Sequence, residues 1–388
     1  MRNSIAGFTA AAVAAIALLS ACSSGASQGP NPSLPRYVAL PDAAVEFAYE
    51  ANEGSTNVSG YKIESDGALT PVKGSPFTAG SSPSGVAIDP TGKFAIASNA
   101  GSNSASAFTI NSTSGALTQV KGSPFGAGTA PSGVAVDSTG KFAYVANVGV
   151  SSSSDVSAYT IGSGGALTTV EGSPFAAGTG AQYVATDPSG KFVYVPNASS
   201  NNVSAYKIAS DGALTPAKGS PFSTGTEPFG VAVEPKAKFA YVSNFGSNNV
   251  SAYAVNATSG ALTPVKGSPF AAGTNACSVI VDPNGKFIDV PNYGSANVSV
   301  YTIKSNGALT QVKGSPFAAG SGACYGAVDP SDKFVYVGNS GAASVSGYQI
   351  GSNGALTPLK GSPFPAGQTP AVIATCRVTS GKCVPPPL

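Results

Sequence analysis

The chain of 388 residues contains no histidine and no tryptophan, and it has few charged residues, 20 Lys and Arg against 18 Asp and Glu. Histidine is the usual general base near neutral pH and the commonest metal ligand, so its absence argues against both roles. The net charge is only +2, and the sequence has no basic cluster of the kind that binds nucleic acid. We therefore expect no bound metal, no cofactor and no nucleic-acid partner.

Glycine and proline are abundant instead, with 48 and 30 copies. Such a composition can indicate disorder. Here, however, the 42% of hydrophobic residues fall in short β-type runs, which indicate a folded chain rich in turns. Outside the amino-terminal segment no stretch shows the 3.6-residue periodicity of a helix. The sequence therefore predicts an all-β fold.

The first 21 residues are predicted to be an export signal. An apolar run from Phe8 to Leu19 follows Arg2, and the segment ends in Leu19-Ser20-Ala21-Cys22. A run this short, followed by small residues, is typical of a signal peptide, because a spanning helix needs about 20 apolar residues. The ending resembles the lipobox of bacterial lipoproteins, which implies cleavage before Cys22 and lipidation of its sulfur. The alternative is an ordinary signal peptide with an incidental cysteine.

These observations predict three parts: a signal peptide over 1–21, the lipidated Cys22 with a flexible tether over 22–35, and a folded domain over 36–388. A lipid anchor would hold the protein on a membrane. We expect an exported monomer in the bacterial cell envelope, at the outer membrane or on the periplasmic or cell surface. Besides the membrane, we expect a small polar ligand or a protein as its partner.

A Gly-Ser-Pro-Phe motif divides the folded part into repeats. Successive copies start 47 to 50 residues apart, at Gly74, Gly122, Gly172, Gly219, Gly267, Gly314 and Gly361. Each unit contains four short β-like runs separated by Gly, Pro, Asn and Asp, as in 183–222. A fixed period of this size indicates a repeat architecture. Seven units of four strands predict a seven-bladed β-propeller, with the first run of each unit innermost.

The carboxyl-terminal stretch predicts how the ring closes. After the seventh motif, Pro370–Thr375 repeats the pattern of an inner strand. We expect it to complete the blade whose other strands run from about Phe47 to Phe77, because pairing the two chain ends removes an open sheet edge. Arg36–Leu40 competes for the same position, and the sequence leaves both alternatives open.

The second strands carry a family resemblance. Phe142–Asn147 (FAYVAN), Phe192–Asn197 (FVYVPN) and Phe239–Asn244 (FAYVSN) resemble the YVTN-type repeats of the seven-bladed lactonase family, which includes bacterial 6-phosphogluconolactonase. The resemblance implies a propeller fold and lactone hydrolysis by His, Arg and Glu side chains at the channel mouth. This chain lacks histidine, and the arginines beyond its signal segment are Arg36 and Arg377, near the two ends. No family catalytic residue can be carried over.

Features that recur among the repeats are predicted to be structural. These are the Gly-Ser-Pro-Phe turns, the asparagine that ends each second strand, and the Asp-Pro-x-Gly turns at Asp89, Asp187 and Asp282. We expect each Gly-Ser-Pro-Phe turn to connect an outer strand to the next inner strand. The aspartate turns lack the alternating oxygen ligands of a calcium loop. A functional site should instead break the repeat.

Several residues break it. Asp289 takes the position of Tyr144 and its equivalents, where burial would raise its pKa and make it a conceivable general acid or base. Glu227 is a second catalytic candidate. The starts of the inner strands vary, and an enlarged loop spans 148–155. From these departures we predict ligand-binding residues at Gln182, Tyr183, Phe229, Tyr325 and Asp155.

Four cysteines remain once Cys22 is set aside as the lipidation site. Cys277 and Cys324 each lie five residues before the aspartate that ends their strand, so they occupy equivalent positions on neighbouring blades. Cys376 and Cys383 flank one turn. In an exported protein these pairs are predicted to form two disulfides.

Three functions follow from the sequence, in this order. The first is a cell-envelope binding or scaffold module of the lactonase-like family, acting through its loop-rich face. The second is a lactonase that uses Asp289 or Glu227 with water. The third is a surface-displayed adhesion or structural protein. Binding is preferred because the family's catalytic side chains are missing, so whether the protein is an enzyme is left open.

Overall fold

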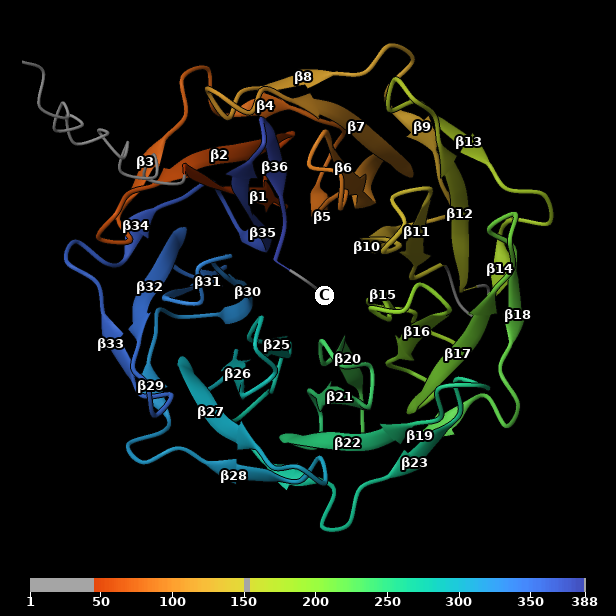
Figure 1. Ribbon diagram of the computed structural model, residues 1–388, viewed down its shortest axis with the longest axis vertical. Coiled ribbons are helices and arrows are strands. Elements are labelled where there is room, and N and C mark those ends of the chain that lie inside the picture. The colour runs from red at the N-terminus through yellow and green to blue at the C-terminus, as the bar shows by residue number, and fades with distance from the viewer. Residues whose placement is uncertain (1–44, 150–153, 387–388) are drawn as a thin grey trace, which may run out of the picture. The chain divides into compact units, whose positions relative to one another are not determined.

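A computed structural model describes residues 45–149 and 154–386. The predicted signal peptide, Cys22, the tether and Arg36–Leu40 lie outside these residues. The compact unit Ala43–Leu388 consists of seven antiparallel sheets arranged in a ring around a central channel (Figure 1). The seven-bladed β-propeller predicted from the repeat is therefore confirmed.

The first two strands of each blade lie nearest the axis. The innermost strands, starting with the blade that the chain ends complete, are β35 (Pro370–Thr379), β5 (Pro83–Ile88), β10 (Pro131–Val136), β15 (Ala185–Thr186), β20 (Pro228–Val233), β25 (Ile280–Val281) and β30 (Ala323–Val328). The second strands are β1 (Glu46–Asn52), β6 (Phe94–Asn99), β11 (Phe142–Asn147), β16 (Phe192–Asn197), β21 (Phe239–Asn244), β26 (Phe287–Asn292) and β31 (Phe334–Asn339). We number the blades one to seven in this order.

The outer half of each blade differs from the prediction in one respect: two short strands, instead of one, pair with the third strand. The third strands are β2 (Asn57–Ile63), β7 (Ser104–Ile110), β12 (Asp155–Ile161), β17 (Asn202–Ile208), β22 (Asn249–Val255), β27 (Asn297–Ile303) and β32 (Ser344–Ile350). Outside them lie the short strands β3 (Leu69–Pro71), β8 (Leu117–Gln119), β13 (Leu167–Thr169), β18 (Leu214–Pro216), β23 (Leu262–Pro264), β28 (Leu309–Gln311) and β33 (Leu356–Pro358). A second short piece in each blade pairs with the same third strand: β4 (Phe77–Thr78), β9 (Phe125–Gly126), β14 (Phe175–Ala176), β19 (Phe222–Ser223), β24 (Phe270–Ala271), β29 (Phe317–Ala318) and β34 (Phe364–Pro365).

The Gly-Ser-Pro-Phe motif therefore divides the outermost strand in two. It was predicted to connect an outer strand to the next inner one, and that detail was wrong. The serine of the motif binds the third strand of its own blade: the amide of Gly60 donates to Ser75 Oγ at 2.9 Å, and the amide of Ala158 to Ser173 Oγ at 2.9 Å. The motif has a structural role, as predicted, because it keeps the outer edge attached where the strand turns.

Neighbouring blades are joined by buried tyrosines of the second strand. The hydroxyl of Tyr144 donates to the carbonyl of Gly212 on the next blade at 3.1 Å, and that of Tyr194 to Gly260 at 3.1 Å. Tyr49, Tyr241 and Tyr336 make the equivalent bonds. A buried hydroxyl needs a partner, so the tyrosine is both a core residue and a link between blades.

Repeated polar residues satisfy the loops and turns, as expected. Asp187 Oδ1 accepts from the amides of Lys191 and Phe192 at 2.8 and 2.7 Å, across the turn between the first and second strands. Asn197 Nδ2 donates to Asn202 Oδ1 and Ser204 Oγ at 2.7 and 2.9 Å, across the opposite loop. These groups bind the backbone and one another, so they are structural.

The carboxyl-terminal strand closes the ring. β35 pairs antiparallel with β1, with Ala48 opposite Thr375. The predicted strand from the carboxyl terminus therefore supplies the inner position of blade one. β35 is longer than predicted and continues through a tight turn into β36 (Lys382–Val384), which pairs with it on the channel side (Figure 1).

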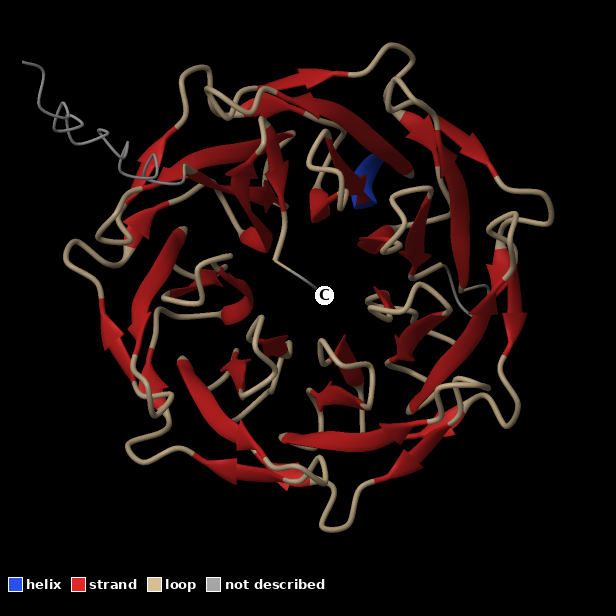
Figure 2. Ribbon diagram, viewed as in Figure 1, coloured by secondary structure: helices blue, strands red, loops and turns tan. Residues whose placement is uncertain are grey.

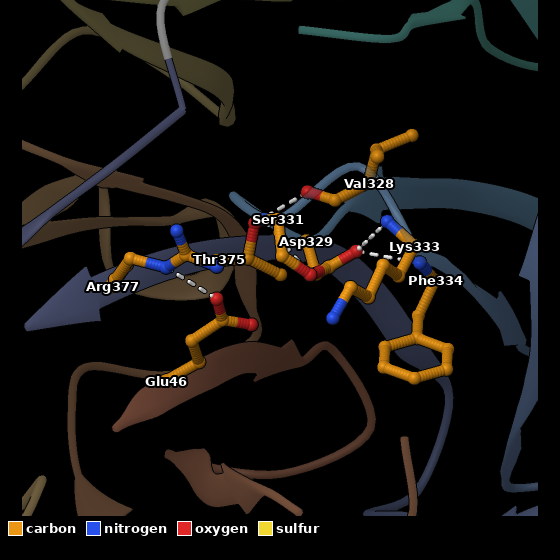
Figure 3. A network of polar contacts seen from close by, with 8 residues as sticks. All are labelled: Glu46, Val328, Asp329, Ser331, Lys333, Phe334, Thr375 and Arg377. Atoms are coloured by element: carbon orange, nitrogen blue, oxygen red, sulfur yellow. Dashed lines mark hydrogen bonds and ion pairs between the residues drawn. The ribbon is translucent and has the colours of Figure 1, made fainter. Parts of the chain in front are cut away.

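Side chains secure this closure at the end of the channel near β36. Thr375 Oγ1 donates to the carbonyl of Val328 on blade seven at 2.7 Å, and Arg377 Nε pairs with Glu46 Oε1 at 2.7 Å (Figure 3). Burial and the nearby Asp329 raise the pKa of Glu46 to about 7, against the lowering effect of Arg377. Arg377 therefore belongs to the closure of the ring.

Helix is nearly absent from the described residues. The short 3₁₀ helix η1 (Ala100–Ser102) follows β6 (Figure 2). Within residues 45–149 and 154–386, no helix is long and apolar enough to cross a membrane.

Candidate functional site

Two cavities lie along the axis of the ring. The first, which we call the mouth cavity, has a volume of about 300 Å³ and lies where the inner strands begin. The second, the channel cavity, has a volume of about 230 Å³ and is lined by the middles of the inner strands. All seven blades contribute to the mouth cavity, because the start of an inner strand reaches it from every blade.

One part of the mouth cavity is polar. Ser84, Ser132 and Gln182 line it from the starts of inner strands, and Ser340 and Glu53 line it from the residues that directly follow second strands. The backbone amide of Glu53 donates to the carbonyl of Thr369 at 3.0 Å, which ties its loop to the start of β35. Among the described residues that line this cavity, Glu53 supplies the carboxylate.

The other part is aromatic. Phe229 starts an inner strand on blade five, and Phe245 and Tyr293 follow the second strands of blades five and six. Phe229 lies 5.6 Å from Phe245 and 6.0 Å from Tyr325, measured between ring centroids. Contacts at these distances are attractive for aromatic pairs. The mouth cavity therefore has an aromatic side formed by blades five to seven.

Two titratable groups of the mouth, the Glu53 carboxyl and the Tyr325 phenol, have a raised pKa. Glu53 is solvent-exposed at the mouth, and the protein atoms around it partly desolvate its carboxyl and raise its pKa above the ordinary value. The pKa of Tyr325 is raised well above its ordinary value by burial, by Tyr183 and by the charge of Glu53. Tyr325 therefore keeps its proton at neutral pH and can act as a hydrogen-bond donor. A carboxylate beside a neutral phenol can accept a proton and stabilise a developing oxyanion.

A disulfide forms part of the cavity wall. Cys277 and Cys324 are joined across blades six and seven, with Cα atoms 4.9 Å apart, and both line the mouth cavity. Cys376 and Cys383 form the second disulfide, between β35 and β36, with Cα atoms 5.2 Å apart. Both predicted pairs are thus present. The first fixes the position of two neighbouring inner strands where the cavity opens.

The channel cavity is mainly apolar. Its walls are valine, isoleucine and alanine side chains of the inner strands, such as Val86, Val134 and Val231. Pro385 and Pro386, just beyond β36, line it as well. The end of the chain lies against blade two, because the amide of Cys383 donates to the carbonyl of Gly92 at 3.0 Å. No room exists for a side chain at Gly92, whose Cβ would lie 2.4 Å from the backbone of Cys383.

The predicted binding residues divide between these places. Gln182, Phe229 and Tyr325 line the mouth cavity, and Tyr183 lines the channel cavity directly beside it. Asp155 lies elsewhere, at the start of β12, where Asn147 Nδ2 donates to its Oδ1 at 2.7 Å. Its position is the one that Asn202 holds in blade four. Residues 150–153 of the enlarged loop lie outside the described residues.

Neither predicted catalytic carboxylate lines the mouth cavity or the channel cavity. Asp289 is 3% exposed in β26, opposite Ile280 and Val300, and its Oδ1 has no hydrogen-bond partner within the described part of the chain. Burial, together with the charges of Asp282 and Asp332, raises its pKa to about 8. Glu227 is exposed just before β20, and its carbonyl accepts the amide of Phe245 at 2.8 Å. The structure therefore leaves both residues away from the two cavities.

Sequence reasoning missed Glu53, Phe245 and Tyr293. All three occupy the same repeat position, directly after the asparagine that ends a second strand. In three other blades that position holds a small residue, Ala100, Ala198 or Ser340. The signal was therefore present in the sequence as a departure from the repeat.

Comparison with known proteins agrees with the fold. The family model described as "Lactonase, 7-bladed beta-propeller" matches residues 26–181, 125–226 and 153–279, overlapping segments that extend over most of the chain. No curated protein gave a significant match.

Solved structures share the fold at low sequence identity. The periplasmic gluconolactonase PpgL of Pseudomonas aeruginosa is 18% identical, with a TM-score of 0.73 over 85% of this chain and 99% of that one. A candidate 6-phosphogluconolactonase of Bacteroides fragilis is 19% identical, with a TM-score of 0.72 over 86% of this chain and 98% of that one. A similar protein of Bacteroides uniformis is 17% identical, with a TM-score of 0.71 over 86% and 99%.

Proposed function

The chain belongs to the seven-bladed β-propeller lactonase family, and on this basis we propose that it hydrolyses a neutral lactone in the mouth cavity. The observation that carries the proposal is Glu53, a solvent-exposed carboxylate on the wall of that cavity, whose pKa is raised by partial desolvation there. A binding module was preferred from the sequence because the family's catalytic side chains are missing. A carboxylate at the mouth weakens that preference.

In the proposed reaction Glu53 acts as a general base. Its carboxylate accepts a proton from water while the water oxygen attacks the carbonyl carbon of the lactone. The phenol of Tyr325 donates a hydrogen bond to the carbonyl oxygen as negative charge develops on it. The bond between the carbonyl carbon and the ring oxygen then breaks. The ring oxygen takes the proton from Glu53 and leaves as a hydroxyl group, which gives the open hydroxy acid.

The charges around the axis favour a neutral substrate. No lysine or arginine is among the residues that line either cavity. Phosphate groups are usually held by arginine or lysine, and the lysines of the Gly-Lys turns, such as Lys93 and Lys191, follow the inner strands at their other ends. A plain sugar lactone therefore fits the mouth better than a phosphorylated one. The gluconolactonase among the structural neighbours is consistent with this substrate class.

The test is turnover of glucono-δ-lactone and 6-phosphoglucono-δ-lactone by the purified full-length protein. We expect hydrolysis of the neutral lactone, and a loss of about 10²- to 10⁴-fold in kcat/KM for Glu53→Gln. Glu227→Gln is the matched control, because Glu227 is an exposed carboxylate outside the cavity lining, and it should leave kcat/KM unchanged. Hydrolysis no faster than the uncatalysed rate on a broad lactone panel would exclude the activity.

We also propose that the protein is exported and anchored by a lipid on Cys22. The support is the Leu19-Ser20-Ala21-Cys22 sequence and the two disulfides, which are usual in exported proteins. Labelled fatty acid should enter the wild-type protein in bacterial cells and should not enter Cys22→Ser. Equal labelling of both proteins would contradict the anchor.

A further inference from the structure

Aromatic side chains occupy four regular positions of the repeat. They stand near the start and at the middle of the second strand, at the fifth residue of the third strand, and in Gly-Ser-Pro-Phe, as in Phe192, Tyr194, Tyr206 and Phe222 of blade four. Those positions form the packing between and within blades. Among residues 45–149 and 154–386, only five aromatic side chains stand outside them: Tyr183, Phe229, Phe245, Tyr293 and Tyr325.

All five belong to one continuous track. Tyr293 contacts Phe245 with ring centroids 6.0 Å apart, and Phe245 contacts Phe229 at 5.6 Å. Phe229 contacts Tyr325 at 6.0 Å, and Tyr325 stacks on Tyr183 at 5.9 Å. The track runs from the rim, over the aromatic side of the mouth cavity, to the top of the channel cavity. Packing of the blades does not require it, because the other repeats hold small or polar residues at most of the same positions.

The outer end of the track lies open. Tyr293 is 44% exposed, and no other large hydrophobic side chain among the described residues is exposed. Phe245 and Phe229 are half-buried. A single exposed aromatic residue needs no explanation, but one that continues a line of rings out of a cavity does. The contact surface for a ligand is therefore longer than the mouth cavity itself.

The surroundings of the track indicate the chemistry of the ligand. Near it are neutral hydrogen-bonding groups, the Gln182 amide and the Ser340 hydroxyl, together with the Glu53 carboxylate. No cation lines the cavity among residues 45–149 and 154–386, so a nucleotide or a phosphorylated sugar would lack a partner there for its phosphate. A pyranose ring suits the track. Its C–H face packs on the negative face of an aromatic ring, and its hydroxyls point outward to amide, hydroxyl and carboxylate groups.

We propose that Phe245 and Tyr293 form a second sugar subsite, so that the preferred ligand is an aldonolactone carrying a further sugar residue. The lactone ring lies in the mouth cavity near Glu53 and Tyr325, and the attached sugar stacks on Phe245 and Tyr293 at the rim. This inference rests on the proposed lactonase function for the identity of the first ring. The stacking subsite itself stands on the aromatic track.

The experiment separates binding from hydrolysis. Cellobiose and maltose, which no lactonase can hydrolyse, are titrated into the full-length protein by calorimetry beside glucose, and the lactones of cellobionic, maltobionic and gluconic acid are assayed for turnover. We expect at least one disaccharide to bind more tightly than glucose. Tyr293→Ala should weaken that binding by about 3- to 10-fold, a loss typical of one aromatic contact. Tyr293→Phe is the matched control, because it keeps the ring and should keep the affinity.

Each failure has a distinct signature. Disaccharide binding that is no tighter than glucose binding, or that is unchanged in Tyr293→Ala, overturns the second subsite even if gluconolactone is hydrolysed. Tyr293-dependent disaccharide binding without any lactone turnover supports the subsite and contradicts the lactonase. Because Tyr293 is exposed, its replacement should not unfold the chain, and the melting temperature of the variant checks this point.

Discussion

Tyr325 stacks on Tyr183 with ring centroids 5.9 Å apart and the ring planes inclined by 24°. The two residues hold equivalent positions on the inner strands of blades seven and four, where blades two, three and five have glycine. One ring lines the mouth cavity and the other the channel cavity. The pair therefore marks the boundary between a polar and aromatic mouth and an apolar channel.

The hydroxyl of Tyr325 is predicted to contribute to the chemical step. Tyr325→Phe keeps the stacking on Tyr183 and removes the donor for the carbonyl oxygen. We expect kcat to fall by about 10-fold or more while KM changes little, because the bond strengthens only as charge develops. Tyr183→Phe is the matched control and should leave kcat unchanged. An equal loss in both variants would indicate that the hydroxyls serve packing alone.

The pH dependence of turnover should report Glu53. A general base works in its ionised form, so kcat/KM should rise with pH and level off above the pKa of Glu53. Partial desolvation raises that pKa above the ordinary value of 4.5, so the midpoint should lie above 4.5. The pH–rate profile of the wild-type protein measures it. In Glu53→Gln the residual kcat/KM should no longer rise with pH around this midpoint. A rise that persists unchanged would assign the base to another group.

Asp289 is predicted to limit stability at high pH. Its pKa of about 8 in the folded state exceeds the model-peptide value of 3.8, so the folded protein holds a proton that the unfolded chain releases. Stability should therefore decrease as pH rises from about 4 to 8. Asp289→Tyr removes the buried carboxyl and restores the residue that other blades use, so it should raise the melting temperature at pH 8 by roughly 2 °C or more.

Ile96→Tyr is the control for this variant. Ile96 is the other second-strand position that lacks the tyrosine, but it carries no charge. Any stabilisation by Ile96→Tyr should be independent of pH, whereas that by Asp289→Tyr should grow between pH 5 and pH 8. If plots of melting temperature against pH were parallel for the two variants, Asp289 would not titrate in this range.

The two disulfides should differ in their contribution to stability. In the chain-entropy account a disulfide that closes a longer loop stabilises more, and the sequence separations are 47 for Cys277–Cys324 and 7 for Cys376–Cys383. We expect replacing the first pair by serine to lower the free energy of unfolding by about 1–2 kcal/mol more than replacing the second. Denaturant titration of both double variants measures the difference. A larger loss for the second pair would show that the closing hairpin matters more than loop length.

Ring closure can be tested by shortening the chain. Ending it after Thr379 removes β36 and the Cys376–Cys383 disulfide but keeps the pairing of β35 with β1. Ending it after Gln368 removes β35 as well and exposes the edge of β1, which is open to pairing with other chains. The first protein should remain a soluble monomer and the second should aggregate, as light scattering would show. Soluble behaviour of both would contradict the role of β35.

The sequence by itself determined the ring. The spacing of Gly-Ser-Pro-Phe and the short β-type runs are local features, so the number of blades and their strand order followed from them. For the closing strand the sequence offered both Pro370–Thr375 and Arg36–Leu40, and the structure shows Pro370–Thr375 paired with β1. The cysteine pairs followed as well, because a repeat places Cys277 and Cys324 side by side on neighbouring blades and because Cys376 and Cys383 flank one turn. Only the course of the outermost strand around the motif was predicted wrongly.

The tertiary structure alone decided which further side chains join the predicted Gln182, Phe229 and Tyr325 at the axis. Glu53, Phe245 and Tyr293 come from three blades and are far apart along the chain, and each is an isolated departure from its own repeat. Asp289 departs from its repeat just as clearly, yet it points into the packing between strands. A repeat fixes the position of a residue within its blade, but closure of the ring determines which of these positions face a common cavity.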